Sequence, residues 1–118
     1  MGRKPTICGI RRRDTMKKAR AWLDTHGIVH EFHDYEVKGI GRDRLAARIG
    51  QVGLEPLLDR AGTTFRKLPE AEKQNLDIEQ AIALMLARPF MIERPVLDVD
   101  GELLVEFDPA AYEAVLGA

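Results

Sequence analysis

The spacing of apolar residues near the N-terminus predicts a strand, a helix and a second strand in succession. An apolar run over 6–10 is typical of a short buried strand. Apolar residues then recur at helical spacing, which predicts a helix that begins with Asp14 as its N-cap and stops at Gly27. The segment 29–35 reads as the second strand, with Phe32 on its apolar face. A strand-helix-strand unit of this length predicts two parallel strands joined by a right-handed crossover.

The middle of the chain shows shorter helical patterns. One apolar stripe lies within 42–49, and a second comprises Leu54, Leu57 and Leu58. Gly62 interrupts the pattern, and Pro69 is expected to start a further helical turn.

A better-defined helix is predicted after Asp77. Asp77 and Gln80 have the spacing of a capping box, with Asp in place of Ser or Thr. The apolar side of this helix is expected to comprise Ile78, Ala81, Ile82 and Met85. Pro89 is expected to end it.

The C-terminal pattern predicts a β-hairpin followed by a helix. The segments 96–99 and 102–105 flank Asp100-Gly101, which suits a type I′ turn because both central residues need positive φ. A closing helix is expected to start at Pro109, with Ala110, Val115 and Leu116 on its apolar side. The order of elements predicts an α/β (α+β) fold, a mixed sheet with flanking helices, in a single domain over 1–118. Both ends of the chain are expected to share one core, in which Trp22 is largely buried.

Composition narrows the class of protein. The chain has 118 residues, of which 45% are hydrophobic and 31% are charged, a globular balance. It has no serine and one cysteine, which excludes a Ser-His-Asp hydrolase, an internal disulfide framework and a multi-cysteine zinc site. Apolar runs of about five residues are too short to span a bilayer. No apolar signal segment follows the first basic residues, so we expect a cytoplasmic protein without membrane or direct nucleic-acid binding.

Charge is distributed unevenly along the chain. Residues 3–20 carry eight basic residues against Asp14, a net charge of +7. Residues 93–118 carry seven acidic residues against Arg94, a net charge of −6. One interpretation is that two solvated faces attract each other; the other is a local anion-binding site near residues 11–18.

Three arginines lie where the first strand should lead into the first helix. A helix N-terminus presents unpaired backbone N–H groups and the positive end of the helix dipole, so Arg11, Arg12 and Arg13 beside Asp14 suggest an anion site. Alternatively, the guanidiniums point into water or pair with the acidic C-terminal segment.

Other candidate chemistry is weaker. His26, His30 and His33 are expected to be surface or partly buried side chains, because a helix end and strand alternation separate them. Gly39 and Gly41 lack the rest of a dinucleotide fingerprint, which indicates a loop. Cys8 is expected to be a buried structural thiol within the first strand.

Several motifs, in order, resemble the arsenate reductase (ArsC)/Spx family, most closely its YffB-type branch. They cover about residues 7–112 and comprise Gly9-Ile10, Asp14 to Arg20, Trp22-Leu23, Phe32 to Tyr35, Gly62 to Leu68, Ala83 to Met85 and Ile92 to Leu97. The resemblance implies a thioredoxin-like fold with a helical insertion between the second and third strands. It also implies that Arg94-Pro95 is cis and lies close to Arg13, although the general frequency of X-Pro bonds favours trans.

The sequence differs from the family pattern at the positions of the family's reactive cysteines. The resemblance places a nucleophilic cysteine immediately before Asp14, where this chain has Arg13, and a second cysteine of some relatives at Met16. Arg94 matches an arginine beside the family's thiol, and Arg60 falls near another. Glu106 stands where YffB-like relatives have Gly and arsenate reductases have Arg.

Two classes of function remain. The first is a catalytically degenerate member that binds an anion, glutathione or a protein partner. We expect it to be a monomer without a bound cofactor. Its expected binding residues are Arg11, Arg12, Arg13, Asp14, Lys17, Arg60, Arg94 and Pro95. The alternative is an active glutathione-linked arsenate or thiol reductase, as the family resemblance suggests, with glutathione as co-substrate.

Overall fold

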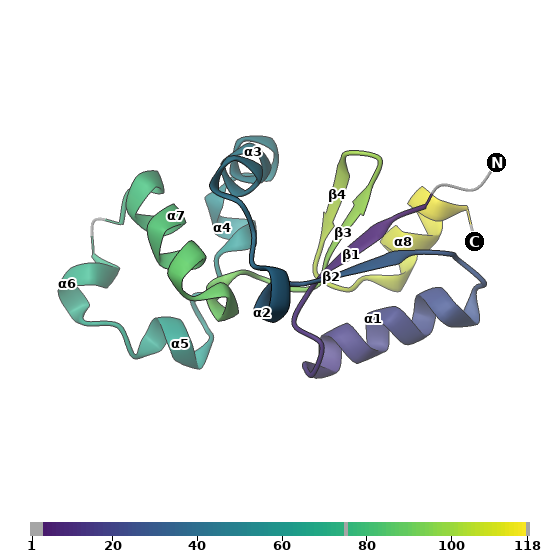
Figure 1. Cartoon of the computed structure of the whole chain (residues 1–118), viewed down its shortest axis with the longest axis horizontal. Helices are drawn as coiled ribbons and strands as arrows, with labels where there is room; N and C mark the ends of the chain where they lie inside the picture. The colour runs from purple at the N-terminus through teal and green to yellow at the C-terminus, as the bar shows by residue number, and fades with distance from the viewer. Residues whose placement is uncertain (1–3, 75, 118) are drawn as a thin grey trace. The chain divides into compact units, whose positions relative to one another are not determined.

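The computed structural model describes residues 4–74 and 76–117, which divide into two compact units (Figure 1). The sheet unit combines both ends of the chain, up to Lys38 and from Arg94 onward, and the helical unit is residues 39–93. The sheet unit contains β1 (Thr6–Gly9), α1 (Asp14–Thr25), β2 (Glu31–Asp34), α2 (Tyr35–Lys38), β3 (Val96–Val99), β4 (Glu102–Val105) and α8 (Pro109–Leu116). The helical unit contains α3 (Arg42–Val52), α4 (Leu54–Leu57), α5 (Thr63–Arg66), α6 (Glu70–Lys73), α7 (Ile78–Ala87) and the 3₁₀ turn η1 (Pro89–Met91).

The sheet has the strand order β2-β1-β3-β4, so β1 lies between β2 and β3 (Figure 1). β1 pairs with β2 in parallel and with β3 antiparallel, and β3 pairs with β4 antiparallel. The predicted parallel unit and the mixed sheet are therefore confirmed. The first strand ends at Gly9 rather than Ile10. The second is shorter than the predicted 29–35: it begins at Glu31 and ends at Asp34, directly before α2.

One face of this sheet carries the core of the unit. Ile7 and Leu97 are register partners, and both belong to a buried cluster with residues of α1 and α8. The other members of the cluster are Met16, Ala19, Leu23, Val99 and Tyr112. Because neighbouring residues of a strand point to opposite faces, Cys8 lies on the face away from α1.

The ends of α1 follow from local sequence. The helix begins at Asp14 as predicted, but Arg13 is the N-cap, and no side chain caps the helix there. At the other end, Gly27 has a φ of 67°. The Gly27 and Ile28 N–H groups donate to the carbonyls of Asp24 and Leu23, the hydrogen-bond pattern of a Schellman motif.

The hairpin has the predicted strands and turn. Asp100 and Gly101 have φ angles of 53° and 94°, so both occupy the positive-φ region that a type I′ turn requires. The Gly101 N–H donates to Asp98 Oδ1 at 2.8 Å and tightens the turn.

The capping box of α7 is confirmed, since Asp77 accepts from the Gln80 N–H and the Gln80 side chain accepts from the Asp77 N–H. The predicted apolar side needs one correction: Ile82 and Met85 are buried, but Ile78 is 53% exposed. Ile78 is the first residue of the helix, and this position faces solvent. The helix ends at Ala87, and Pro89 opens η1.

Trp22 is less buried than the sequence predicts, and a neighbouring tyrosine is more deeply buried than it. Trp22, expected to be largely buried, is partly buried, with its ring stacked on His26 at 3.9 Å. Tyr112 of α8 is instead fully enclosed, edge-on to Trp22 and Phe107. The Tyr112 hydroxyl has no hydrogen-bond partner among the described residues. Burial raises the pKa of this phenol well above its usual range.

We expect Tyr112→Phe to keep or raise the free energy of unfolding at pH 7, by up to about 1 kcal/mol, because the variant removes a buried unpaired hydroxyl. Above about pH 10 the phenol ionises in the unfolded chain but not in the folded one. Wild-type stability should therefore fall more steeply with pH than that of the variant. Urea denaturation of both proteins at pH 7 and at higher pH measures this difference, and a loss above about 1 kcal/mol at pH 7 contradicts it.

Glu106 follows β4 in a backbone conformation that favours glycine. Its φ is 68°, and its N–H donates to the Pro95 carbonyl at 2.9 Å. A left-handed backbone costs an L-residue roughly 1–2 kcal/mol. We expect Glu106→Gly to raise the free energy of unfolding by about 1 kcal/mol.

Glu106→Ala is the matched control, because it removes the carboxylate but keeps the Cβ. It should give no comparable gain in a thermal or urea denaturation experiment. A gain of equal size in both variants would mean that charge, rather than backbone conformation, sets the effect.

Candidate functional site

The candidate site lies where β1 leads into α1. We call residues 11–13 the basic loop. The Arg13 N–H donates to the Ile10 carbonyl at 3.2 Å, and the Arg13 carbonyl accepts from the Lys17 N–H at 3.0 Å. Arg13 is therefore the residue on which α1 starts. Arginine has no acceptor atom, so its side chain cannot cap the N–H groups of the first helical turn.

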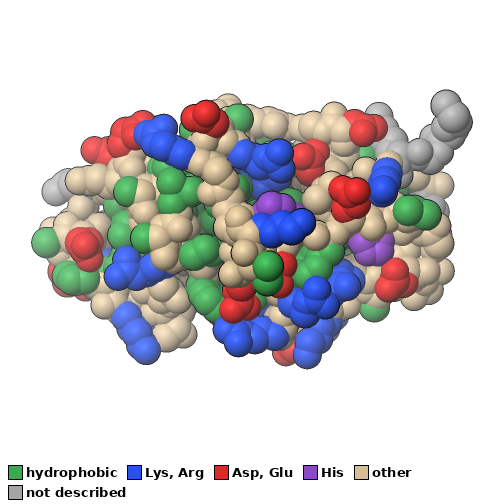
Figure 2. All heavy atoms as spheres, in the orientation of Figure 1, with side chains coloured by type: hydrophobic (Ala, Val, Ile, Leu, Met, Phe, Trp, Pro, Cys, Tyr) green, Lys and Arg blue, Asp and Glu red, His purple; other side chains and the backbone are tan. Residues whose placement is uncertain are grey.

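Basic side chains surround this helix start. The three arginines of the basic loop and Lys17 are all exposed. Figure 2 shows Lys and Arg side chains gathered around the start of α1, with acidic side chains among them. The first-turn N–H groups, the positive end of the helix dipole and these cations together favour a negatively charged ligand.

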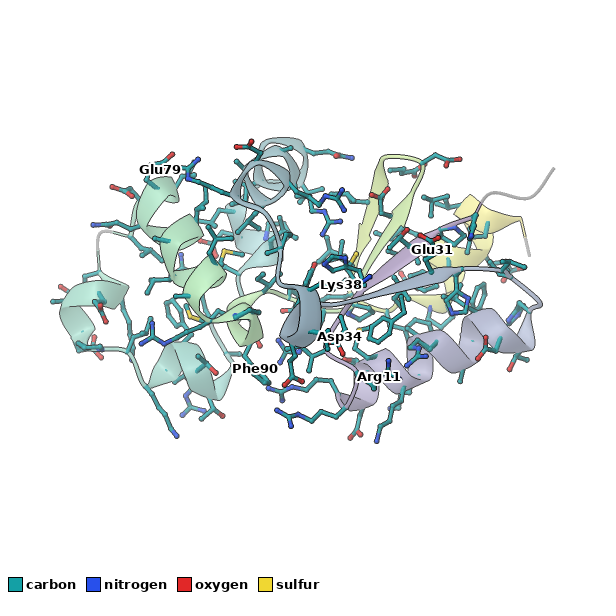
Figure 3. All side chains as sticks on the ribbon, viewed as in Figure 1. Arg11, Glu31, Asp34, Lys38, Glu79 and Phe90 are labelled. Carbon is teal, nitrogen blue, oxygen red and sulfur yellow. The ribbon has the colours of Figure 1, made fainter. Side chains whose placement is uncertain are left out.

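Two of the arginines contact acids that the sequence analysis did not assign to them. Arg11 Nε lies 3.9 Å from Asp34 Oδ2, and the Arg12 guanidinium donates to Glu36 Oε2 at 3.1 Å. Figure 3 shows Arg11 and Asp34 side by side. These two acidic partners lie at the end of β2 and in α2. Because β1 and β2 are parallel, their carboxyl ends meet, and this geometry could have indicated the pairs.

These ion pairs leave the arginines accessible to a ligand. Arg11 and Arg12 remain largely exposed, and Arg11 also lies over the Phe32 ring at 5.2 Å. The Arg12–Glu36 pair joins two exposed residues. Such pairs contribute about 0–1 kcal/mol, so a bound anion can compete for the Arg12 donors. Asp34 and Glu36 lower the local positive potential without closing the site.

Arg94 lies against the start of the same helix. The Arg94-Pro95 bond is cis, as the family resemblance implied. A Cβ placed on Gly9 would lie 3.2 Å from Arg94 Cβ and 2.3 Å from Met16 Sδ. The end of β1, the first turn of α1 and the residue before Pro95 therefore approach one another closely at Gly9. Arg94 is only 8% exposed.

Cys8 is placed unfavourably for chemistry at this helix. It is 1% exposed and lies in the middle of the sheet, in register with His33 on one side and Val96 on the other. Its side chain is on the face away from α1. The prediction that the Cys8 thiol is buried is confirmed.

Arg60 belongs to the helical unit and is engaged by Glu55. Its guanidinium donates twice to the Glu55 carboxylate, at 2.9 and 2.7 Å, and lies over the Phe65 ring at 5.3 Å. These hydrogen bonds hold the pKa of Glu55 below its usual range. An anion that uses Arg60 would have to compete with this bidentate pair.

The histidines have structural contacts of their own. The His26 Nδ1–H donates to the Trp22 carbonyl and the His30 Nδ1–H to the Ile28 carbonyl, each at 2.8 Å. His33 lies edge-on to Tyr35. Within residues 4–74 and 76–117, no cluster of three or more His, Cys, Asp or Glu side chains has the geometry of a metal site. In the same ranges, no helix is long and apolar enough to cross a membrane.

Comparison with known proteins identifies solved structures that are similar to this chain. A solved structure described as a YffB protein superposes with a TM-score of 0.92 at 52% identity, covering 96% of this chain and 99% of the other. A structure of an arsenate reductase (ArsC) related protein from Brucella melitensis is 54% identical, with a TM-score of 0.78 and coverage of 94% and 92%. The mixed sheet, its helices and these neighbours establish the thioredoxin-like α/β fold of ArsC proteins.

Sequence relatives include proteins with different descriptions. An uncharacterized protein of Haemophilus influenzae is 38% identical over 109 residues, which is 92% of this chain and 96% of that protein. A global transcriptional regulator Spx of Streptococcus mutans is 26% identical, over 85% of this chain and 74% of the regulator. The ArsC family profile matches residues 9–115. Since this match covers nearly the whole chain, the chain belongs to the ArsC family.

Proposed function

We propose that this chain is an ArsC-family protein without thiol chemistry, which binds an anionic ligand at the start of α1. The observation that carries this proposal is the residue at the helix start. Arg13 occupies the N-cap of α1, the position that the family resemblance assigns to the nucleophilic cysteine. The scaffold is retained, and the residue that would react is replaced by one that can only bind.

Thiol reductase chemistry needs a thiolate that can attack arsenic or a disulfide sulfur. An arginine side chain cannot form either covalent intermediate. The chain's single thiol, Cys8, is enclosed between two paired strands on the face away from α1. Its attack on a ligand at the helix start would require β1 to leave the sheet.

The same residues suit non-covalent binding of an anion. The first turn of α1 offers backbone N–H groups, and Arg12, Arg13 and Lys17 offer charged donors around them. A carboxylate of glutathione, an inorganic oxyanion and an acidic side chain of a protein partner share the chemistry that these donors recognise. Glutathione and arsenate are therefore suitable probes of the site.

An active glutathione-linked arsenate or thiol reductase is the second candidate. The observation in its favour is the 54% identity to a protein described as arsenate reductase related. In this alternative Cys8 must be the working thiol, because the chain has no other.

We expect no glutathione-dependent reduction of arsenate or of a mixed disulfide by wild type or by Cys8→Ala. Arg13→Cys would place a thiol at the positive end of α1, so its pKa should fall below the free value of about 8.5. Thr25→Cys, at the opposite end of the same helix, is the matched control and should show no such decrease. Turnover assays and thiolate absorbance against pH measure both effects.

Turnover by wild type, Cys8→Ala and Arg13→Cys distinguishes the binding protein from the active reductase. Turnover by wild type that disappears in Cys8→Ala would refute the binding proposal and identify Cys8 as the nucleophile. An equal thiol pKa in Arg13→Cys and Thr25→Cys would show that the helix start does not stabilise negative charge.

The binding proposal makes its own prediction. Glutathione should shift the backbone amide NMR signals of residues 14–16, with an affinity that falls as salt concentration rises. We expect Arg12→Ala to weaken binding roughly three- to tenfold, and Glu36→Gln to strengthen it by removing a carboxylate that competes with the ligand.

Arg44→Ala is the control for loss of one positive charge, because Arg44 is exposed on α3 of the helical unit. It should leave the affinity unchanged. Equal weakening by Arg12→Ala and Arg44→Ala would show that only net charge matters, and the helix start would then not be a binding site.

A further inference from the structure

A second feature that could bind an anion lies within the helical unit. A cavity of about 270 Å³ is lined by residues of α5, α6 and the segments that end α5 and α7. Its polar lining comprises Thr63, Thr64, Lys67, Glu72 and Arg88. Lys67 and Arg88 are the C-caps of α5 and α7, so two cations from separate helix ends border one cavity.

Three other basic residues of the unit form ion pairs with carboxylates. Arg42 contacts Glu79, Arg60 contacts Glu55, and Lys73 contacts Glu70. Among the described residues, neither Lys67 nor Arg88 has a carboxylate within 4.0 Å, although Glu72 lines the same cavity. Two unpaired cations at one concave surface create a local positive potential that attracts anions.

We propose that this cavity binds the phosphate group of a small molecule. The Arg88 guanidinium presents a planar set of donors that fits two phosphate oxygens, and Lys67 adds a compact positive charge. The Thr63 and Thr64 hydroxyls can rotate to donate to the remaining oxygens. The volume is just below the usual range of about 300–1,000 Å³ for ligand pockets, so it suits a phosphate with few further atoms.

Glu72 is expected to lower the affinity of the cavity for phosphate. Glu72 is one of the residues that line the cavity. A carboxylate there should repel a dianionic phosphate. Removing that charge while keeping the shape of the side chain should therefore strengthen binding. This expected gain in affinity distinguishes a built site from a general attraction to positive charge.

The test is a titration of the full chain with inorganic phosphate, followed by backbone amide NMR at constant ionic strength. Thr63, Thr64 and Lys67 should shift together. Lys67→Ala and Arg88→Ala should each weaken binding roughly three- to tenfold, and Glu72→Gln should strengthen it several-fold. Arg44→Ala, which removes a charge outside the cavity, should have no effect.

A second arm replaces inorganic phosphate with glycerol phosphate. Tighter binding of the ester would identify a small phosphomonoester as the ligand, and tighter binding of the free ion would identify inorganic phosphate. The proposal is overturned if Arg44→Ala weakens binding as much as Arg88→Ala, or if the cavity amides do not shift with either probe. This test is independent of the test of the α1 site. Binding at the α1 site is followed by the signals of residues 14–16 and is weakened by Arg12→Ala.

Discussion

The central position of β1 is the constraint on which the sheet unit depends. All four residues of Thr6–Gly9 pair with β2, and the first three also pair with β3, so this strand joins segments from both ends of the chain. Their side chains point alternately to the two faces of the sheet. Ile7 contributes to the core with α1 and α8, whereas Cys8 faces the other way. The end of the strand sets where α1 begins, and the position of Arg13 follows from it.

Close packing at Gly9 fixes the geometry of the candidate site. Met16 of α1 and the Cβ of Arg94 approach the backbone so closely that any side chain at position 9 would displace them. The first turn of α1 is thereby held beside the cis Arg94-Pro95 bond. The arginines of the basic loop remain exposed beside this packing, and the ion pair of Arg12 with Glu36 is weak enough to exchange for a ligand.

Features determined by neighbouring residues could be predicted from the sequence. The Asp100-Gly101 turn, the Asp77 capping box and the Gly27 helix stop each depend on local backbone preferences. The four-residue helices α2 and α5 were not predicted, because helices this short are stable only through tertiary packing. Burial also depends on packing, so the full enclosure of Tyr112 and the exposure of Ile78 could not be derived from a helical stripe. At the site, the sequence indicated the basic loop, and the resemblance indicated Arg13 and the cis bond; the pairs with Asp34 and Glu36 depend on strand pairing.

The sheet unit is discontinuous along the chain, and this has a consequence for synthesis on the ribosome. The helical unit, residues 39–93, is contiguous and can form its contacts as soon as it emerges. The pairing of Cys8 with Val96 must wait until β3 has been translated. Until then β1 is a nascent strand without one of its two neighbours, and the apolar side of α1 lacks Leu97 and Tyr112 as partners. The interval between translation of β1 and of β3 is therefore the period in which this chain most needs protection from aggregation.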